Sequence, residues 1–294
     1  MDSIPETSSP SMPVLTDLAS LRRWIADCRA QGEQIGFVPT MGALHPGHLA
    51  LLQAARNATQ RVVVSIFVNP TQFGPQEDFA RYPRTLEQDR ALLEKAGCDA
   101  LFLPDAALMY PPGFQTTVQV EPLGSDLCGR TRPGHFAGVA LVVTLLLHMV
   151  QPDVIVLGLK DYQQFVLLRR LVQDLAMPIQ VVGVPTVRES DGLALSSRNR
   201  YLDEKQRHQA RCLYQALVAA RDMRRSGQTD PLVLEETARQ ILEASGVDVV
   251  EYVALRDQVT LLPVTRIQED PVLLMAVKLG TTRLIDNMVL SVAD

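Results

Sequence analysis

Short apolar runs alternate with helix-length segments over the first two thirds of the chain, and this alternation limits the possible folds more than any other feature. Several runs are rich in β-branched residues, which is typical of strands buried on both faces. Strands that alternate with helices of this length form βαβ units around a parallel sheet. The sequence therefore predicts an α/β fold with a doubly wound parallel sheet, whose strands cover residues 35–38, 62–68, 100–103, 154–157 and 179–184.

Polar segments without helical or strand periodicity follow four of these strands. In a doubly wound sheet, ligands bind beyond the carboxyl ends of the strands, so segments that follow different strands meet at one edge. We therefore expect a single ligand site, built from residues 39–48, 69–84, 158–164 and 185–200.

The pattern changes after about residue 188. Asp203 and Gln206 have the spacing of a capping box, which predicts a helix running to about Arg225. Asp230-Pro231 predicts the start of a second helix, and the runs 249–255, 272–277 and 283–285 are typical of antiparallel strands. We expect two domains, 14–188 for the doubly wound sheet and 189–294 for a smaller α+β domain, after a disordered tail at 1–13.

Composition narrows the class of protein. Of the 294 residues, 47% are hydrophobic and 21% are charged, and the net charge is −5. An acidic chain is a poor partner for nucleic acid, although a local cationic pocket for a small phosphate ligand remains compatible with it. The longest apolar stretch, 138–150, is too short to span a bilayer, and the four cysteines are scattered. We expect a cytoplasmic protein that binds neither nucleic acid nor membrane.

Two histidines lie in the turn that follows the first predicted strand. His45 and His48 are three residues apart at the start of a helix, where free N–H groups attract anions. Imidazolium N–H groups there would suit a phosphate. Zinc is the alternative, but a catalytic zinc needs a third protein ligand, for which His135 is the candidate. The turn therefore favours an anion site over a metal site.

Three further motifs carry polar chemistry. In Gly158–Gln164, Lys160 follows a strand directly, and Gln164 lies one helical turn beyond it. Asp161 is a candidate helix cap, or else an acceptor for a ribose hydroxyl. Ser196, Ser197 and Arg198 suit phosphate oxygens, or else form an ordinary polar linker.

In Gly129–Phe136, either Arg130 or Arg132 is a candidate carboxylate clamp. The chain contains neither a P-loop nor a dinucleotide-binding fingerprint.

Taken together and in order, these motifs resemble the pantoate–β-alanine ligase (pantothenate synthetase) family over about residues 14–290. The matching segments are PTMGALHPGH (39–48), FVNPTQFGPQEDFARYPRT (67–85), RPGHFAGV (132–139), GLKDYQQ (158–164), VPTVRESDGLALSSRNRYL (184–202) and LGTTRLIDN (279–287). The resemblance implies a Rossmann-like domain of the HIGH-motif nucleotidyltransferase type. It also implies a homodimer that joins pantoate to β-alanine through pantoyl adenylate, using ATP and Mg²⁺.

The resemblance also implies site residues by matching position. The ATP-binding set is Met41, Gly42, Ala43, Leu44, His45, Pro46, Gly47, His48, Gly158, Leu159, Lys160, Asp161, Val187, Leu195, Ser196, Ser197 and Arg198. Within it, the residues expected to act in catalysis are His45, His48, Lys160, Ser196, Ser197 and Arg198. Gln72 and Gln164 would hold pantoate, Gln72 would also contact β-alanine, and Asp89 would lie near the magnesium.

Three positions depart from the family pattern. Leu159 stands where the family usually has Glu, Leu195 where it usually has Met, and Pro46 where it usually has an acidic residue. We expect these changes to alter ATP affinity rather than the reaction. The rival interpretations are a cytidylyl- or adenylyltransferase of the same superfamily and a non-catalytic nucleotide-sensing module.

Overall fold

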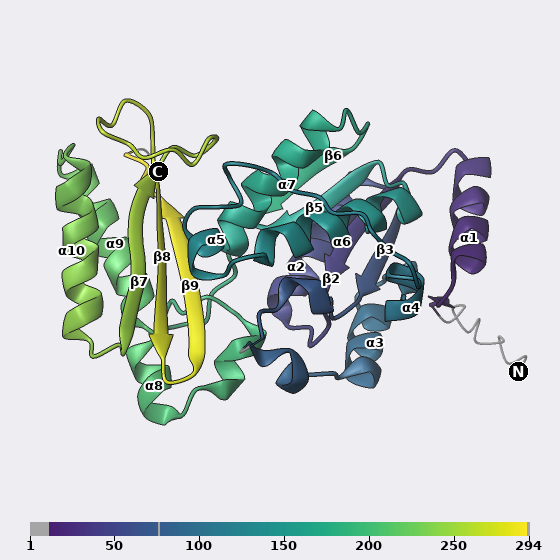
Figure 1. Cartoon of the computed structure of the whole chain (residues 1–294), viewed down its shortest axis with the longest axis horizontal. Coiled ribbons are helices and arrows are strands. Elements are labelled where there is room, and N and C mark those ends of the chain that lie inside the picture. Colours follow the sequence, from purple (N-terminus) through teal and green to yellow (C-terminus); the bar gives the residue numbers. More distant parts are fainter. Residues whose placement is uncertain (1–11, 76, 293–294) are drawn as a thin grey trace, which may run out of the picture.

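Six parallel strands form the larger of two sheets in the computed structural model, which describes residues 12–75 and 77–292 (Figure 1). The strand order is β1-β4-β3-β2-β5-β6, so the direction of winding reverses between β2 and β5. The strands are β1 (Val14–Leu15), β2 (Ile35–Thr40), β3 (Arg61–Ile66), β4 (Ala100–Phe102), β5 (Val154–Gly158) and β6 (Gln180–Val184). The predicted doubly wound sheet is confirmed, and the two-residue strand β1, too short to show a pattern, was not predicted.

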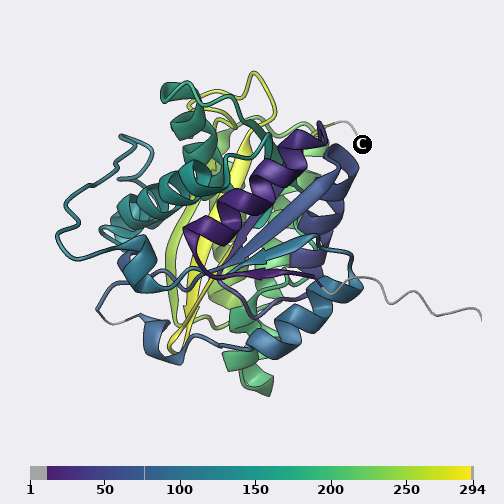
Figure 2. The ribbon, with the colours of Figure 1, turned by 90° about the vertical axis from the view of Figure 1, so that its right-hand side faces the viewer.

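Helices cover both faces of this sheet, as Figure 2 shows. Alternate residues of each strand point to opposite faces: Phe37 and Ile155 enter one core, whereas Val38 and Val156 enter another. The first core is covered by α1 (Leu18–Ala30), α6 (His135–Val150) and α7 (Tyr162–Asp174), and the second by α2 (Pro46–Ala58) and α3 (Leu86–Lys95). Burying each such apolar side chain contributes about 1.5–3 kcal/mol, so the two cores hold the strand ends rigidly.

Short helices lie in the connections. They are η1 (Pro70–Gln72), η2 (Asp78–Arg81), α4 (Ala106–Met109), α5 (Cys128–Thr131), η3 (Leu159–Asp161), η4 (Ser197–Tyr201) and α8 (Glu204–Gln209). The capping box of Asp203 and Gln206 is confirmed at the start of α8. The helix predicted to run on to Arg225 is interrupted at residues 210–211 and resumes as α9 (Cys212–Arg225), because i→i+3 hydrogen bonds tighten the chain there.

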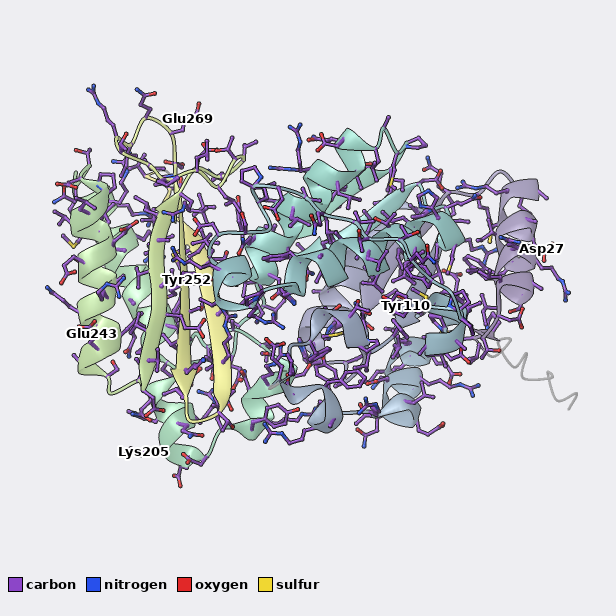
Figure 3. The ribbon with its side chains drawn as sticks, viewed as in Figure 1. Asp27, Tyr110, Lys205, Glu243, Tyr252 and Glu269 are labelled. Carbon is purple, nitrogen blue, oxygen red and sulfur yellow. The ribbon has the colours of Figure 1, made fainter. Side chains whose placement is uncertain are left out.

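The second sheet is antiparallel and has the order β7-β8-β9. Its strands are β7 (Val249–Arg256), β8 (Val272–Leu279) and β9 (Thr282–Val289), and α9 and α10 (Pro231–Ala244) pack on one face. The other face, which includes Tyr252 (labelled in Figure 3) and Leu274, shares one hydrophobic core with α6 and α7. The second sheet is therefore packed directly against the first half of the chain.

Residues 1–11 of the tail predicted at 1–13 lie outside the described residues. Met12 is buried, and the carbonyl of Pro13 accepts a hydrogen bond from the N–H of Leu101, so these two residues are part of the fold. Among the described helices, none is long and apolar enough to cross a membrane.

A glycine lets α6 approach the end of β3 closely. A Cβ atom at Gly138 would lie 2.3 Å from the carbonyl oxygen of Thr71, and the Gly138 carbonyl accepts a hydrogen bond of 3.2 Å from the side chain of Asn69. This contact fixes η1, and with it Gln72, against the apolar face of α6.

We expect Gly138→Ala to lower the free energy of unfolding by about 1–3 kcal/mol, because the backbone of η1 must move to admit the methyl group. Gly74→Ala is the matched control, since a Cβ there meets nothing closer than 3.7 Å. It should change the stability by no more than about 1 kcal/mol. Urea unfolding of the two variants checks the difference, and equal midpoints would contradict this account of the contact.

Candidate active site

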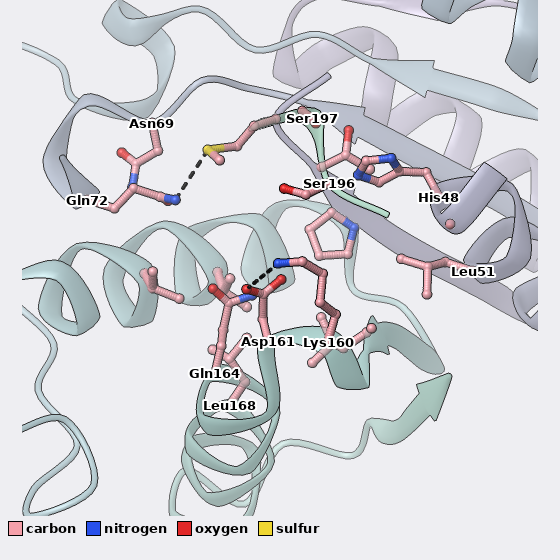
Figure 4. Close-up of a pocket in the computed structure, with 18 of the residues that line it drawn as sticks. His48, Leu51, Asn69, Gln72, Lys160, Asp161, Gln164, Leu168, Ser196 and Ser197 are labelled. Atoms are coloured by element: carbon pink, nitrogen blue, oxygen red, sulfur yellow. Dashed lines mark hydrogen bonds and ion pairs between the residues drawn. The ribbon is translucent and has the colours of Figure 1, made fainter. Parts of the chain in front are cut away.

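A cavity of about 240 Å³ opens at the carboxyl ends of β2, β5 and β6. All four predicted polar segments contribute to its wall (Figure 4). The predicted site residues that line it are Met41, His45, Gly47, His48, Gln72, Gly158, Lys160, Asp161, Gln164, Val187, Leu195, Ser196, Ser197 and Arg198. Six others do not line it: Gly42, Ala43, Leu44, Pro46, Asp89 and Leu159.

The two histidines cap the start of α2 reciprocally. Nδ1 of His45 accepts a hydrogen bond of 3.2 Å from the N–H of Gly47, and Nδ1 of His48 accepts one of 3.3 Å from the N–H of His45. Pro46 occupies the first helical position, where no N–H is needed. A Cβ at Gly47 would lie 2.9 Å from Cε1 of His45, so glycine is what lets that ring fold back over the turn.

Both imidazoles are neutral at pH 7. Burial, together with the nearby charge of Lys160, lowers the pKa of His45 to about 4. Burial and the neighbouring His45 lower the pKa of His48 to about 3. Since each Nδ1 accepts a hydrogen bond, each ring carries its proton on Nε2. The expectation of imidazolium groups is therefore corrected: the turn offers two neutral Nε2–H donors.

The third histidine considered for a zinc site has other partners. His135 contacts Nη1 of Arg132 at 2.9 Å and the carbonyl oxygen of Gln72 at 2.8 Å. Within residues 12–75 and 77–292, no group of three His, Cys, Asp or Glu residues could hold a metal ion.

Asp89 lies beneath the histidine turn. Its carboxylate accepts hydrogen bonds of 2.9 Å from the N–H of Ala43 and 2.8 Å from that of Leu44, and a third of 3.2 Å from the hydroxyl of Thr85. Its exposed fraction is 2%. The structure thus corrects the magnesium assignment of Asp89, because both oxygens are occupied and sealed from the cavity. The carboxylate instead fixes a turn in which Gly42 and Ala43 have positive φ.

Lys160 and Gln164 enter the cavity from η3 and from the first turn of α7 (Figure 4). Nζ of Lys160 is 3.7 Å from Asp161, whose side chain makes no cap to the following helix, contrary to our expectation. The Asn287 side chain, on β9, donates hydrogen bonds of 2.9 and 2.8 Å to the carbonyls of Leu159 and Lys160. The second sheet therefore holds the lysine segment in place.

The serine–arginine loop, Ser196–Arg198, is held by hydrogen bonds to other parts of the chain, unlike an ordinary linker. The Ser197 hydroxyl donates to the carbonyl of Ala43 at 3.4 Å, and the Arg198 side chain donates two hydrogen bonds to Asp78, of 3.0 and 2.9 Å. At the base of the loop, Arg188 binds Asp286 through two hydrogen bonds of 2.6 and 2.9 Å, and the carboxylate of Asp286 is 1% exposed. The loop is anchored on both halves of the chain.

Gln72 and Gln164 both line the cavity, and Figure 4 shows both side chains. The side-chain Oε1 of Gln72 accepts a hydrogen bond from the Asn69 side chain at 3.1 Å, and its NH₂ group contacts the sulfur of Met41 at 3.2 Å. The apolar wall beside it comes from α6, with Val139, Val142, Val143 and Leu146.

Neither candidate arginine of the 129–136 loop is a free carboxylate clamp. Arg132 is bound to Glu77 through two hydrogen bonds of 2.6 Å, and Arg130 is exposed and lies 3.5 Å from Asp126. The prediction of a clamp is wrong because the carboxylate partners of both arginines belong to the chain itself.

Four polar residues support the site in ways that were not predicted from the sequence, in which only His135 was considered, as a zinc ligand. Asn69 and His135 orient Gln72, while Asp286 and Asn287 anchor the segments 185–200 and 158–164. Asp286 and Asn287 lie on a strand, where buried polar side chains are unusual. That mismatch with an apolar strand face was the available signal.

Comparison with known proteins places this geometry in a family. A family model described as Pantoate-beta-alanine ligase matches residues 13–289. The chain belongs to this family. The resemblance found from the motifs is thereby confirmed.

Relatives and solved structures agree with this membership. The chain is 55% identical over 282 residues to a pantothenate synthetase of Magnetococcus marinus, covering 95% of this chain and 96% of that protein. It matches the crystal structure of a Thermus thermophilus pantothenate synthetase with a TM-score of 0.91 and 48% identity, over 95% and 99% of the two chains. A Francisella tularensis pantoate-beta-alanine ligase, crystallised with beta-gamma ATP and beta-alanine, matches with a TM-score of 0.79 and 34% identity, over 95% and 98%.

We expect the imidazoles of His45 and His48 to remain neutral, with the proton on Nε2, until the pH falls toward their pKa values of about 4 and about 3. Two-bond ¹H–¹⁵N NMR spectra, assigned with His45→Gln and His48→Gln variants, report this directly. The folded pKa values lie below the unfolded value of about 6.5, so these rings should reduce stability as the pH falls from about 6.5 toward 4. Titration of either ring near pH 6.5 would contradict the reciprocal cap.

Proposed function

We propose that this member of the pantoate–beta-alanine ligase family joins pantoate to β-alanine in two steps with the residues of this cavity. The observation that carries the proposal is the pairing of two unlike walls. One wall presents neutral histidine donors, Lys160 and the serine–arginine loop, which suit phosphate. The other presents Gln72 and Gln164 beside apolar side chains, which suit a hydroxy acid.

In the first step, a pantoate carboxylate oxygen attacks the α-phosphorus of ATP in line, and pyrophosphate leaves. Charge develops on the non-bridging and leaving oxygens, so fixed donors and cations stabilise the transition state. We assign this role to Nε2–H of His45 and His48, to Lys160, and to the loop of Ser196, Ser197 and Arg198. The remaining residues of the ATP-binding set are proposed to bind through their backbone or by packing, or, like Gly42–Leu44, to shape the turn behind the cavity wall.

Neutral amides suit the pantoate subsite for a chemical reason. Pantoate must present a reactive carboxylate, and a lysine bound to that group would reduce its nucleophilicity. Glutamine amides bind the hydroxyl and carboxyl oxygens without neutralising the charge. The dimethyl-substituted carbon of pantoate would pack on the valines of α6.

In the second step, the amine of β-alanine attacks the acyl carbon of pantoyl adenylate. The new C–N bond forms as the C–O bond to phosphate breaks, AMP leaves, and the amine loses a proton. We place β-alanine beside Gln72, because the attacking amine must reach the carbonyl that the glutamines hold.

Magnesium is proposed to enter with ATP, bound to its phosphates, since Mg²⁺ commonly uses substrate phosphates and few protein ligands. Asp89 has no part in this proposal. Leu159, Leu195 and Pro46 replace the usual family residues without removing a group assigned to the chemistry. We expect these three residues to change the affinity for ATP and to leave the reaction unchanged.

The larger organisation is also proposed on the family resemblance. We propose a cytoplasmic homodimer in which residues 14–188 form the nucleotide- and pantoate-binding domain. Residues 189–294 then form the smaller domain that completes the site through Asp286 and Asn287.

Exchange of labelled pyrophosphate into ATP tests the proposed reaction. We expect exchange that depends strictly on pantoate and needs no β-alanine, because adenylation is complete before the amine reacts. Exchange that requires a phosphorylated alcohol instead would identify a nucleotidyltransferase. If neither exchange nor pantothenate formation occurs, the result would favour the interpretation as a non-catalytic nucleotide-sensing module.

Replacing Lys160 and Gln164 separates the two walls. Lys160→Ala should lower the single-turnover rate of adenylation by about 10²-fold or more, since the lysine acts on charge that develops in the transition state. Gln164→Ala should mainly raise the pantoate KM. Wild-type adenylation in Lys160→Ala, or an unchanged pantoate KM in Gln164→Ala, would contradict the assignment concerned.

A further inference from the structure

Two adjacent acidic residues each bind an arginine, and the two arginines belong to different walls of the cavity. Glu77 binds Arg132 through two hydrogen bonds of 2.6 Å. Asp78, the next residue, binds Arg198 through hydrogen bonds of 3.0 and 2.9 Å. Both arginines line the cavity, whereas the two carboxylates lie behind it and line a neighbouring space.

The Glu77 pair leads to the pantoate wall. Nη1 of Arg132 donates to Nε2 of His135 at 2.9 Å, and Nη2 contacts the carbonyl oxygen of Gln72 at 3.3 Å. Burial and the charge of Arg132 lower the pKa of His135 to about 4, so the ring is neutral and Nδ1–H donates to the same carbonyl at 2.8 Å. Glu77 therefore holds a chain of contacts that ends on the backbone of Gln72.

The Asp78 pair leads to the phosphate wall. Asp78 occupies the Nε and Nη2 edge of Arg198 and leaves Nη1 for a phosphate oxygen. The guanidinium carbon lies 5.9 Å from the centre of the Tyr82 ring, and the Tyr201 hydroxyl donates to the carbonyl of Arg81 at 3.0 Å. These contacts join segment 77–82 to the serine–arginine loop on both sides of the ion pair.

The side chains of both ion pairs are largely shielded from solvent. The side chains of Arg132 and Asp78 are each 14% exposed, and those of Glu77 and Arg198 are 25% and 28% exposed. Paired hydrogen bonds to a carboxylate fix the plane of a guanidinium as well as its position. Glu77 and Asp78 are consecutive residues. When the ion pair of one is ordered, it therefore restricts the backbone that carries the side chain of the other.

We propose that Glu77 and Asp78 are positioning residues that couple the two substrate subsites, so that pantoate bound at Gln72 raises the affinity for the triphosphate at Arg198, and the reverse. The proposal rests on the function proposed above for these two walls. Binding on the pantoate wall immobilises Gln72, Arg132 and Glu77, and Asp78 then holds Arg198 already oriented for phosphate. By linkage, the coupling factor must be the same whichever ligand binds first.

Calorimetric titration of α,β-methylene ATP with and without pantoate measures this factor. For the wild-type protein we expect pantoate to tighten analogue binding by about fivefold or more. Asp78→Asn and Glu77→Gln should each bring the coupling factor close to one. The first change removes the ion pair with Arg198, and the second removes the ion pair with Arg132. Asp78→Asn should leave the affinity for pantoate alone unchanged.

The matched control is Glu94→Gln, which breaks an exposed ion pair with Arg90 on α3 and should keep the wild-type factor. Because each variant removes one pair only, either one that folds decides the question. A wild-type factor of one, or a wild-type factor retained in a folded Asp78→Asn or Glu77→Gln variant, would overturn the coupling. Failure of the wild-type protein to bind pantoate at all would instead overturn the proposed function.

Discussion

The turn between β2 and α2 is held from two sides, and the rest of the site depends on it. Below, the buried carboxylate of Asp89 takes the N–H groups of Ala43 and Leu44. Above, His45 and His48 take the N–H groups of Gly47 and His45 itself. The N–H groups of Ala43, Leu44, His45 and Gly47 are thus committed to the fold, and the two imidazoles present their Nε2–H groups to the cavity.

This arrangement explains why the histidines are neutral. An imidazolium at either position would have to give up its accepting Nδ1, and it would lie near Lys160 in a poorly solvated wall. A neutral donor costs less to bury and still strengthens its hydrogen bond as charge develops on phosphate oxygens. In the proposed reaction, Lys160 and Arg198 supply the cationic stabilisation, and their segments follow β5 and β6. The second sheet then supports both segments through Asp286 and Asn287.

The sequence was sufficient to predict whatever depends on local pattern. The apolar runs predicted the parallel strands, the Asp203–Gln206 spacing predicted the start of α8, and the placement of polar segments after strands predicted which ones meet. The partners of charged groups could not be predicted in this way. Asp89 lies 46 residues from Ala43 and Asp286 lies 98 from Arg188, so nothing near either residue indicates its role. The histidine protonation states also follow from burial, which periodicity alone does not quantify.

The central claim is that pantoate and ATP lie face to face between the two walls. A crystal structure with pantoate and α,β-methylene ATP tests it most directly. We expect one pantoate carboxylate oxygen about 3–3.5 Å from the α-phosphorus and in line with the leaving oxygen, with the amides of Gln72 and Gln164 on the acid. Nε2 of His45 and His48 should point at phosphate oxygens. A pantoate hydroxyl facing the α-phosphorus, or pantoate bound away from the two glutamines, would contradict the account.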